Sequence, residues 1–125
     1  MSPTARTVLI VDDALFMRTM IRDILVNTGQ FEVVGEASNG REAVQLYDAL
    51  KPQLVTMDIV MPELDGIEAT REILKKNPQA TIIMCSALGQ EALVIESIAA
   101  GARDFIVKPF TPEKVIRAIE KLPSR

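Results

Sequence analysis

The apolar residues of this 125-residue chain change their spacing repeatedly, and always in the same order. A short apolar run rich in β-branched residues comes first, and a longer stretch follows in which apolar residues recur every three or four positions. The first pattern is typical of strands and the second of helices. The predicted strands are 7–11, 31–37, 54–57, 81–85 and 103–107. Strands that alternate with helices pair in parallel, because each helix is the crossover between two strands.

Turn and capping residues lie where these helices should begin and end. Gly29 and Gly101 follow helical stretches and predict their ends. Thr111 before Pro112 predicts the start of the last helix, since threonine is a frequent cap and proline suits the first helical position. Strand–helix units fill the chain without a linker, so we expect one domain over residues 1–125, with its core at 6–122.

Two of the strands contain near-continuous apolar runs, at residues 8–11 and 82–85. Such strands are buried on both faces, which requires helices on both sides of the sheet. We therefore predict an α/β fold, a three-layer doubly wound (βα)5 sandwich of the flavodoxin-like type, with parallel strands in the order 2-1-3-4-5. In such sheets ligands bind at the carboxyl ends of the strands, where the winding reverses between strands 1 and 3.

The composition excludes several functional classes. Lys and Arg total 14 against 17 for Asp and Glu, a formal net charge of −3, so we expect no nucleic acid partner. The single cysteine excludes an internal disulfide framework, and the absence of histidine excludes His-Asp-Ser hydrolases and histidine-rich zinc sites. The apolar runs are too short to cross a bilayer, and residues 1–6 lack a signal-peptide core. We expect a cytoplasmic protein that binds no membrane.

Polar side chains follow four of the five predicted strands. They are Asp12 and Asp13, Asp58, Ser86 and Lys108. If strands 1 and 3 are neighbours, three carboxylates converge, and two such charges 5 Å apart repel by about 3 kcal/mol at an effective dielectric constant of about 20. A bound cation, a raised pKa of one carboxyl group, or both must compensate for this repulsion. Oxygen ligands alone select a hard ion such as Mg²⁺, and this set of groups suits phosphoryl transfer to a carboxylate.

The motifs VLIVDDA, MDIVMPELDG, CSA and DFIVKPF, at their spacing in this chain, resemble the receiver domain of bacterial two-component response regulators. The resemblance covers essentially residues 6–122 and is strongest to single-domain chemotaxis regulators of the CheY type. It implies that Asp58 accepts a phosphoryl group and that Asp12 and Asp13, with the backbone carbonyl of Val60, bind Mg²⁺.

The resemblance also implies a switch. Ser86 matches a hydroxyl residue that moves toward the phosphoryl group, Lys108 matches the lysine of the family, and Phe105 matches an aromatic residue that turns inward on activation. The implied partners are a histidine kinase of the CheA type, a target such as a FliM-like flagellar motor switch protein, and a phosphatase. The protein would be a signalling module rather than an enzyme, and a monomer.

The fourth predicted helix is apolar almost all round. Val94, Ile95 and Ile98 form one stripe, which we assign to the core. Leu93 and Ala100 lie roughly opposite, and we expect them to form part of a partner-docking face with strand 5 and the final helix. The resemblance likewise implies that this face contacts the target.

Other functions stay open at this point. A magnesium-dependent phosphatase could use an aspartyl nucleophile, but its usual second aspartate is absent where Val60 stands. A flavin carrier could share the fold, but Asp12 and Asp13 would repel its phosphate. The chain could also be the receiver of a longer transcription factor or methylesterase, or a regulator of another phosphorelay. The end of the sequence at Arg125 predicts no effector domain.

Overall fold

The structure is a computed structural model that describes residues 5–87, 90–108 and 110–122. Its strands are β1 (Arg6–Val11), β2 (Phe31–Ala37), β3 (Leu54–Asp58), β4 (Ile82–Ser86) and β5 (Asp104–Val107). Its helices are α1 (Leu15–Asn27), α2 (Gly40–Leu50), α3 (Gly66–Lys76), α4 (Glu91–Ala99) and α5 (Pro112–Glu120). The predicted alternation is confirmed, with each strand boundary within one residue of its prediction. The two ends of the single domain predicted over 1–125 lie outside the described residues.

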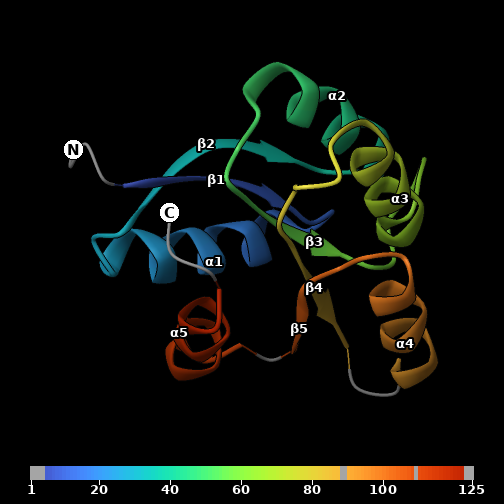
Figure 1. Cartoon of the computed structure of the whole chain (residues 1–125). Helices are drawn as coiled ribbons and strands as arrows, with labels where there is room; N and C mark the ends of the chain where they lie inside the picture. Colours follow the sequence, from blue (N-terminus) through green and yellow to red (C-terminus); the bar gives the residue numbers. More distant parts are fainter. Residues whose placement is uncertain (1–4, 88–89, 109, 123–125) are drawn as a thin grey trace.

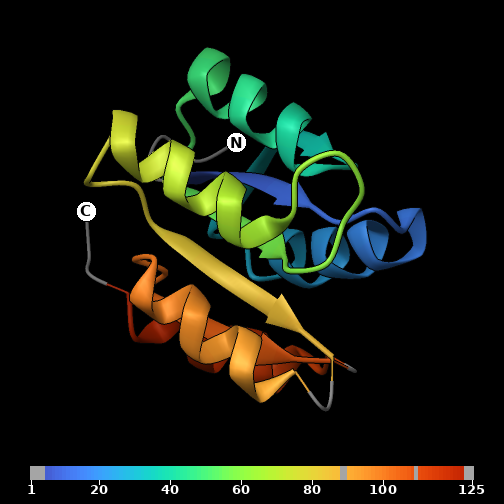
Figure 2. The same cartoon turned by 90° about the vertical axis from the view of Figure 1, so that its right-hand side faces the viewer.

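The five strands form one parallel sheet in the order β2-β1-β3-β4-β5, as predicted. Helices α1 and α5 cover one face, and α2, α3 and α4 cover the other (Figure 1). Figure 2 looks onto the second face, where α2, α3 and α4 lie one below another. The predicted three-layer sandwich is therefore confirmed. None of the helices in the described part of the chain is long and apolar enough to cross a membrane.

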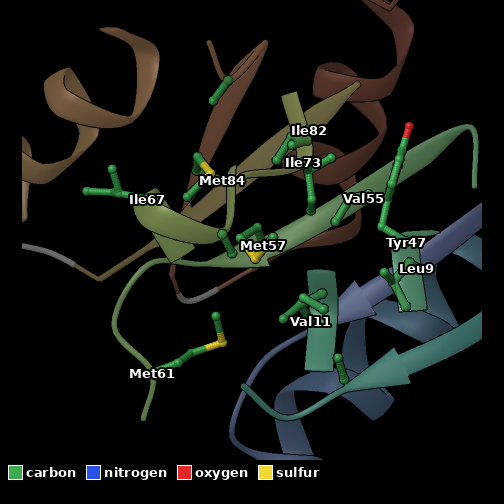
Figure 3. Close-up of a cluster of buried hydrophobic side chains, with 14 of the residues drawn as sticks. Leu9, Val11, Tyr47, Val55, Met57, Met61, Ile67, Ile73, Ile82 and Met84 are labelled. Carbon is green, nitrogen blue, oxygen red and sulfur yellow. The ribbon is translucent and has the colours of Figure 1, made fainter. Parts of the chain in front are cut away.

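Each strand sends alternate side chains into two separate cores. On β1, Leu9 and Val11 face α2 and α3, whereas Val8 and Ile10 face α1 and α5. Figure 3 shows the first core, in which strand side chains meet helix side chains; those labelled are Leu9, Val11, Tyr47, Val55, Met57, Met61, Ile67, Ile73, Ile82 and Met84. Burial on both faces explains why the strands are apolar at consecutive positions.

The predicted helix boundaries are confirmed by backbone geometry. Gly29 and Gly101 have φ angles of 74° and 113°, which glycine adopts without the steric cost that other residues incur. Pro112 is the first residue of α5, and the hydroxyl of Thr111 accepts a hydrogen bond from the backbone N–H of Lys114. These local signals depend on few neighbours, which is why the sequence reveals them.

The orientation predicted for α4 is wrong in part. Ile95 and Ile98 are 71% and 44% exposed, whereas Leu93 and Ala100, predicted to face a partner, pack against the core. The buried centre of the helix is Ser97, whose hydroxyl donates to the carbonyl of Leu93. Because this hydrogen bond satisfies the hydroxyl inside the helix, the serine can be buried, and the helix is rotated relative to the orientation that its apolar pattern suggests.

Candidate functional site

Three carboxylates converge at the carboxyl end of the sheet. Strands β1 and β3 are neighbours, with Val11 beside Met57, so Asp12 and Asp58 leave the sheet side by side. One carboxylate oxygen from each of Asp12, Asp13 and Asp58 lies within 4.8 Å of the other two. Asp12 and Asp58 are buried and Asp13 is exposed. The predicted convergence of three carboxylates is confirmed, and we call this cluster of Asp12, Asp13 and Asp58 the acidic crevice.

Burial and charge leave Asp58 difficult to ionise. Burial first and the neighbouring charge of Asp12 second raise its pKa from 3.8 to about 6, although Lys108 acts to lower it. The Lys108 ammonium lies 3.3 Å from Asp58 Oδ1 and 3.2 Å from Asp12 Oδ2. Burial tends to lower the pKa of this lysine, but the two carboxylates outweigh burial and raise it. Lys108 therefore stays charged and offsets part of the repulsion.

The donor set fits a small, hard cation. Oδ1 of Asp12 accepts from the backbone N–H of Ala14, while Oδ2 is buried and, among the described residues, has an ion pair with Lys108 but no hydrogen-bond partner. A cluster that in the described part of the chain offers three carboxylates and no nitrogen or sulfur ligand suits Mg²⁺. Val60, two residues after Asp58, has a side chain that is 56% exposed. The role of its carbonyl as a further ligand stays a prediction.

Ser86 and Lys108 complete the edge of the crevice. The last residue of β4, Ser86, follows Cys85, which pairs with Asp58 in the sheet. The backbone N–H of Lys108 donates to the Ser86 carbonyl, which joins the two residues across β4 and β5. The Ser86 hydroxyl is buried and has no hydrogen-bond partner among the described residues. A buried hydroxyl without a partner in the described ranges, one residue beyond the strand partner of Asp58, is available to an incoming oxygen-rich group.

Phe105 lies outside this crevice. Its side chain is 42% exposed and borders an apolar groove of about 470 Å³ between α4 and β5. The same groove is lined by Ser86 and by Ile95 and Ile98 on α4. The predicted switch aromatic and the predicted switch hydroxyl therefore line one groove. Its inward rotation stays a prediction.

Gly66, at the start of α3, is a site residue to which the sequence analysis assigned no role. Its backbone N–H donates to the carbonyl of Ile59, and a Cβ atom here would lie 2.0 Å from the carbonyl oxygen of Asp58. Any side chain at this position would therefore displace the backbone that carries Asp58. The only signal in the sequence is the glycine that closes the motif MDIVMPELDG.

The profile of the response regulator receiver domain matches residues 8–120, and the chain belongs to this family of two-component signalling modules. Among its relatives, the chemotaxis proteins CheY of Thermotoga maritima and Bacillus subtilis are each 61% identical over 117 residues, which is 94% of this chain and 97% of each relative. A solved complex, CheX-CheY-BeF3-Mg from Borrelia burgdorferi, contains a similar chain with a TM-score of 0.86 and 38% identity, covering 91% of this chain and 86% of that one.

Proposed function

We propose that this chain is a phosphorylation-controlled switch in bacterial chemotaxis and that Asp58 is its phosphoacceptor. An oxygen of the Asp58 carboxylate forms a bond to phosphorus while the P–N bond of a phosphohistidine on a CheA-like kinase breaks. The imidazole leaves with the bonding electron pair and takes a proton from solvent. The observation that supports this function best is the gathering of the Asp12, Asp13 and Asp58 carboxylates, two of which Lys108 bridges.

The surrounding residues have separate tasks. Asp12, Asp13 and Asp58 would hold Mg²⁺, which when bound supplies positive charge to the phosphoryl oxygens. Lys108 already lies between two carboxylates and can shift toward a phosphoryl oxygen with little movement. The Ser86 hydroxyl, which has no partner in the part of the chain that the structure describes, donates to another oxygen. Phosphorylation can favour the active state only as far as these contacts stabilise that state over the inactive one.

The test uses a small phosphodonor. The parent and Asp58→Asn are incubated with acetyl phosphate and Mg²⁺, and their intact masses are compared. The parent should gain one phosphoryl group and the variant none, with Asp48→Asn, an exposed aspartate on α2, labelled like the parent. A parent that gains nothing, or an Asp58→Asn variant that is labelled, would contradict the proposal. Sustained turnover of a phosphoester would instead favour a magnesium-dependent phosphatase.

We further propose that the surface formed by Ile95, Ile98 and Phe105 meets a FliM-like motor switch protein in the cytoplasm. Two observations support this surface. These large apolar side chains are 71%, 44% and 42% exposed, and Ser86 lines the same groove. The name that the bacterial relatives share supports chemotaxis. The complex of a related CheY with CheX supports a further partner, for which we propose a phosphatase.

Ile95→Asp should weaken binding of the phosphorylated chain to the motor switch protein by about tenfold or more, because it places a charge at the centre of an apolar contact. The free energy of unfolding should change by less than about 0.5 kcal/mol, since this side chain is 71% exposed. Calorimetric titration with the target measures the affinity. Val26→Asp on α1, where the valine is 49% exposed, is the matched control and should bind like the parent. Equal binding by both variants would exclude this surface.

A further inference from the structure

An arginine on α1 is hydrogen-bonded to the backbone of the acidic crevice. Nη1 of Arg18 donates to the carbonyl oxygen of Asp12 at 2.7 Å, and Nε donates to Glu36 Oε1 at 3.0 Å. The side chains of Arg18 and Glu36 are only 16% and 20% exposed. The guanidinium therefore links β2, through Glu36, to the residue that follows β1. A planar guanidinium with several N–H groups can hold two acceptors at once in a fixed geometry.

This contact acts on the peptide unit between two candidate magnesium ligands. The Asp12 carbonyl belongs to the planar group that joins Asp12 to Asp13, so fixing that carbonyl also fixes the direction in which Asp13 leaves it. Asp12 has other anchors, since its N–H donates to the Ala37 carbonyl and its Oδ1 accepts from the Ala14 N–H. The exposed Asp13 carboxylate has no hydrogen bond or ion pair to another residue of the described ranges, so its backbone must position it.

The positive charge of Arg18 cannot itself favour the binding of a cation. A guanidinium cannot ligate Mg²⁺, and a positive charge beside the crevice opposes the entry of another cation. Its partner Glu36 offsets much of this charge. What Arg18 contributes is therefore geometric. Three carboxylates that repel one another tend to separate, and the exposed Asp13 is the one most free to turn toward solvent.

We infer that Arg18, held by Glu36, is a positioning residue for the cation site. It fixes the Asp12–Asp13 peptide so that the Asp13 carboxylate lies close to the other two before a cation binds. The inference rests on the proposed function, because it presumes that the crevice binds Mg²⁺. Groups that orient metal ligands without touching the metal commonly change the affinity for it by tenfold or more.

The chain provides a matched control one turn further along α1. Arg22 pairs with the other carboxylate oxygen of Glu36 and is 49% exposed, and of these two described arginines only Arg18 forms a hydrogen bond with Asp12. Arg22→Met and Arg18→Met thus remove the same charge and the same kind of ion pair. Only Arg18→Met removes the hydrogen bond to the Asp12 carbonyl.

The experiment measures the dissociation constant of Mg²⁺ by calorimetry and the metal-free stability by urea unfolding in a chelator. Arg18→Met should bind Mg²⁺ about tenfold more weakly than the parent, and Arg22→Met about as tightly as the parent or slightly more tightly. Loss of a positive charge alone would strengthen binding in both variants, so weaker binding identifies the geometric role. Arg18→Lys keeps the charge but lacks the planar fork, and should remain weak.

Parental or tighter Mg²⁺ binding by Arg18→Met overturns the inference, as does full recovery in Arg18→Lys. If Arg18→Met does not fold without metal, the double variant Glu36→Gln with Arg22→Met replaces it, because it leaves Arg18 in place without its charged partner and keeps the net charge of the chain unchanged. Several-fold weaker binding supports the inference, and parental binding overturns it. A parent that does not bind Mg²⁺ overturns the proposed cation site itself, which distinguishes the two failures.

Discussion

Asp58→Asn should make the metal-free protein more stable at pH 8 by about 3 kcal/mol, since burial and the Asp12 charge raise the pKa of Asp58 from 3.8 to about 6. The folded chain holds this proton more tightly than the unfolded chain. The raised pKa therefore costs nothing below pH 3.8, and stability is lost progressively as the pH rises from about 4 to about 6. Above that window the parent carries the full cost and the asparagine variant none.

Urea unfolding in a chelator at pH 8 and at pH 4 measures this difference. The advantage of Asp58→Asn should fall to well below about 1 kcal/mol at pH 4, where Asp58 is protonated in the folded parent. Asp23→Asn, an exposed aspartate on α1, is the control and should change little at either pH. An equal gain at both pH values would show that the asparagine stabilises by packing and that Asp58 is not destabilised by its charge.

Mg²⁺ should reduce the advantage of the asparagine variant. A cation that binds only the folded state stabilises it in proportion to the logarithm of its concentration above the dissociation constant. The parent, with three carboxylates, should gain more from added Mg²⁺ than Asp58→Asn, which keeps two. A stability difference that does not change with Mg²⁺ would mean that Asp58 is not a ligand.

Gly66→Ala should lower both the stability of the protein and its affinity for Mg²⁺. The added Cβ would lie 2.0 Å from the Asp58 carbonyl oxygen and 3.0 Å from the Ile59 Cα, and backbone atoms in a sheet cannot yield as a flexible side chain can. We expect a loss of about 3 kcal/mol in the free energy of unfolding, near the upper end for overpacking. The displaced backbone carries Asp58, so Mg²⁺ affinity should fall by about tenfold or more.

Gly40→Ala is the control that separates the loss of stability from the loss of Mg²⁺ affinity. Its Cβ would lie 2.0 Å from the Leu64 carbonyl oxygen, a clash of the same size that does not involve the Asp58 backbone. Its stability should fall comparably, while the folded fraction binds Mg²⁺ nearly as the parent does. Urea unfolding and calorimetric titration measure both quantities. Parental stability and affinity in Gly66→Ala would refute the close approach of α3 to β3.

Short-range patterns made most of the fold predictable from the sequence. A run of apolar residues, a glycine such as Gly101 and a cap such as Thr111 act over a few residues, so they indicate an element wherever they occur. Parallel strands then bring their carboxyl ends to one edge, and Asp12, Asp13 and Asp58 follow from that rule. Here the prediction and the structure agree.

The rotation of α4 and the details of the site could not be predicted in this way. Whether Ser97 or Ile95 is buried depends on a hydrogen bond inside the helix and on the fit of that helix to the sheet. The contacts of Arg18 with Asp12 and of Gly66 with Asp58 depend on how closely separate elements approach. None of these leaves a periodic signal in the chain.

The sequence by itself determined the order of the elements, the parallel sheet and the identity of the acidic residues at its edge. Only the tertiary structure decided which side of α4 is exposed, how far the pKa of Asp58 rises, and which residues hold the crevice in shape. The physical reason is the separation along the chain of the residues that interact. Spacing and capping act between residues a few positions apart, whereas burial, charge interactions and steric contact depend on distances between residues that are far apart in the chain.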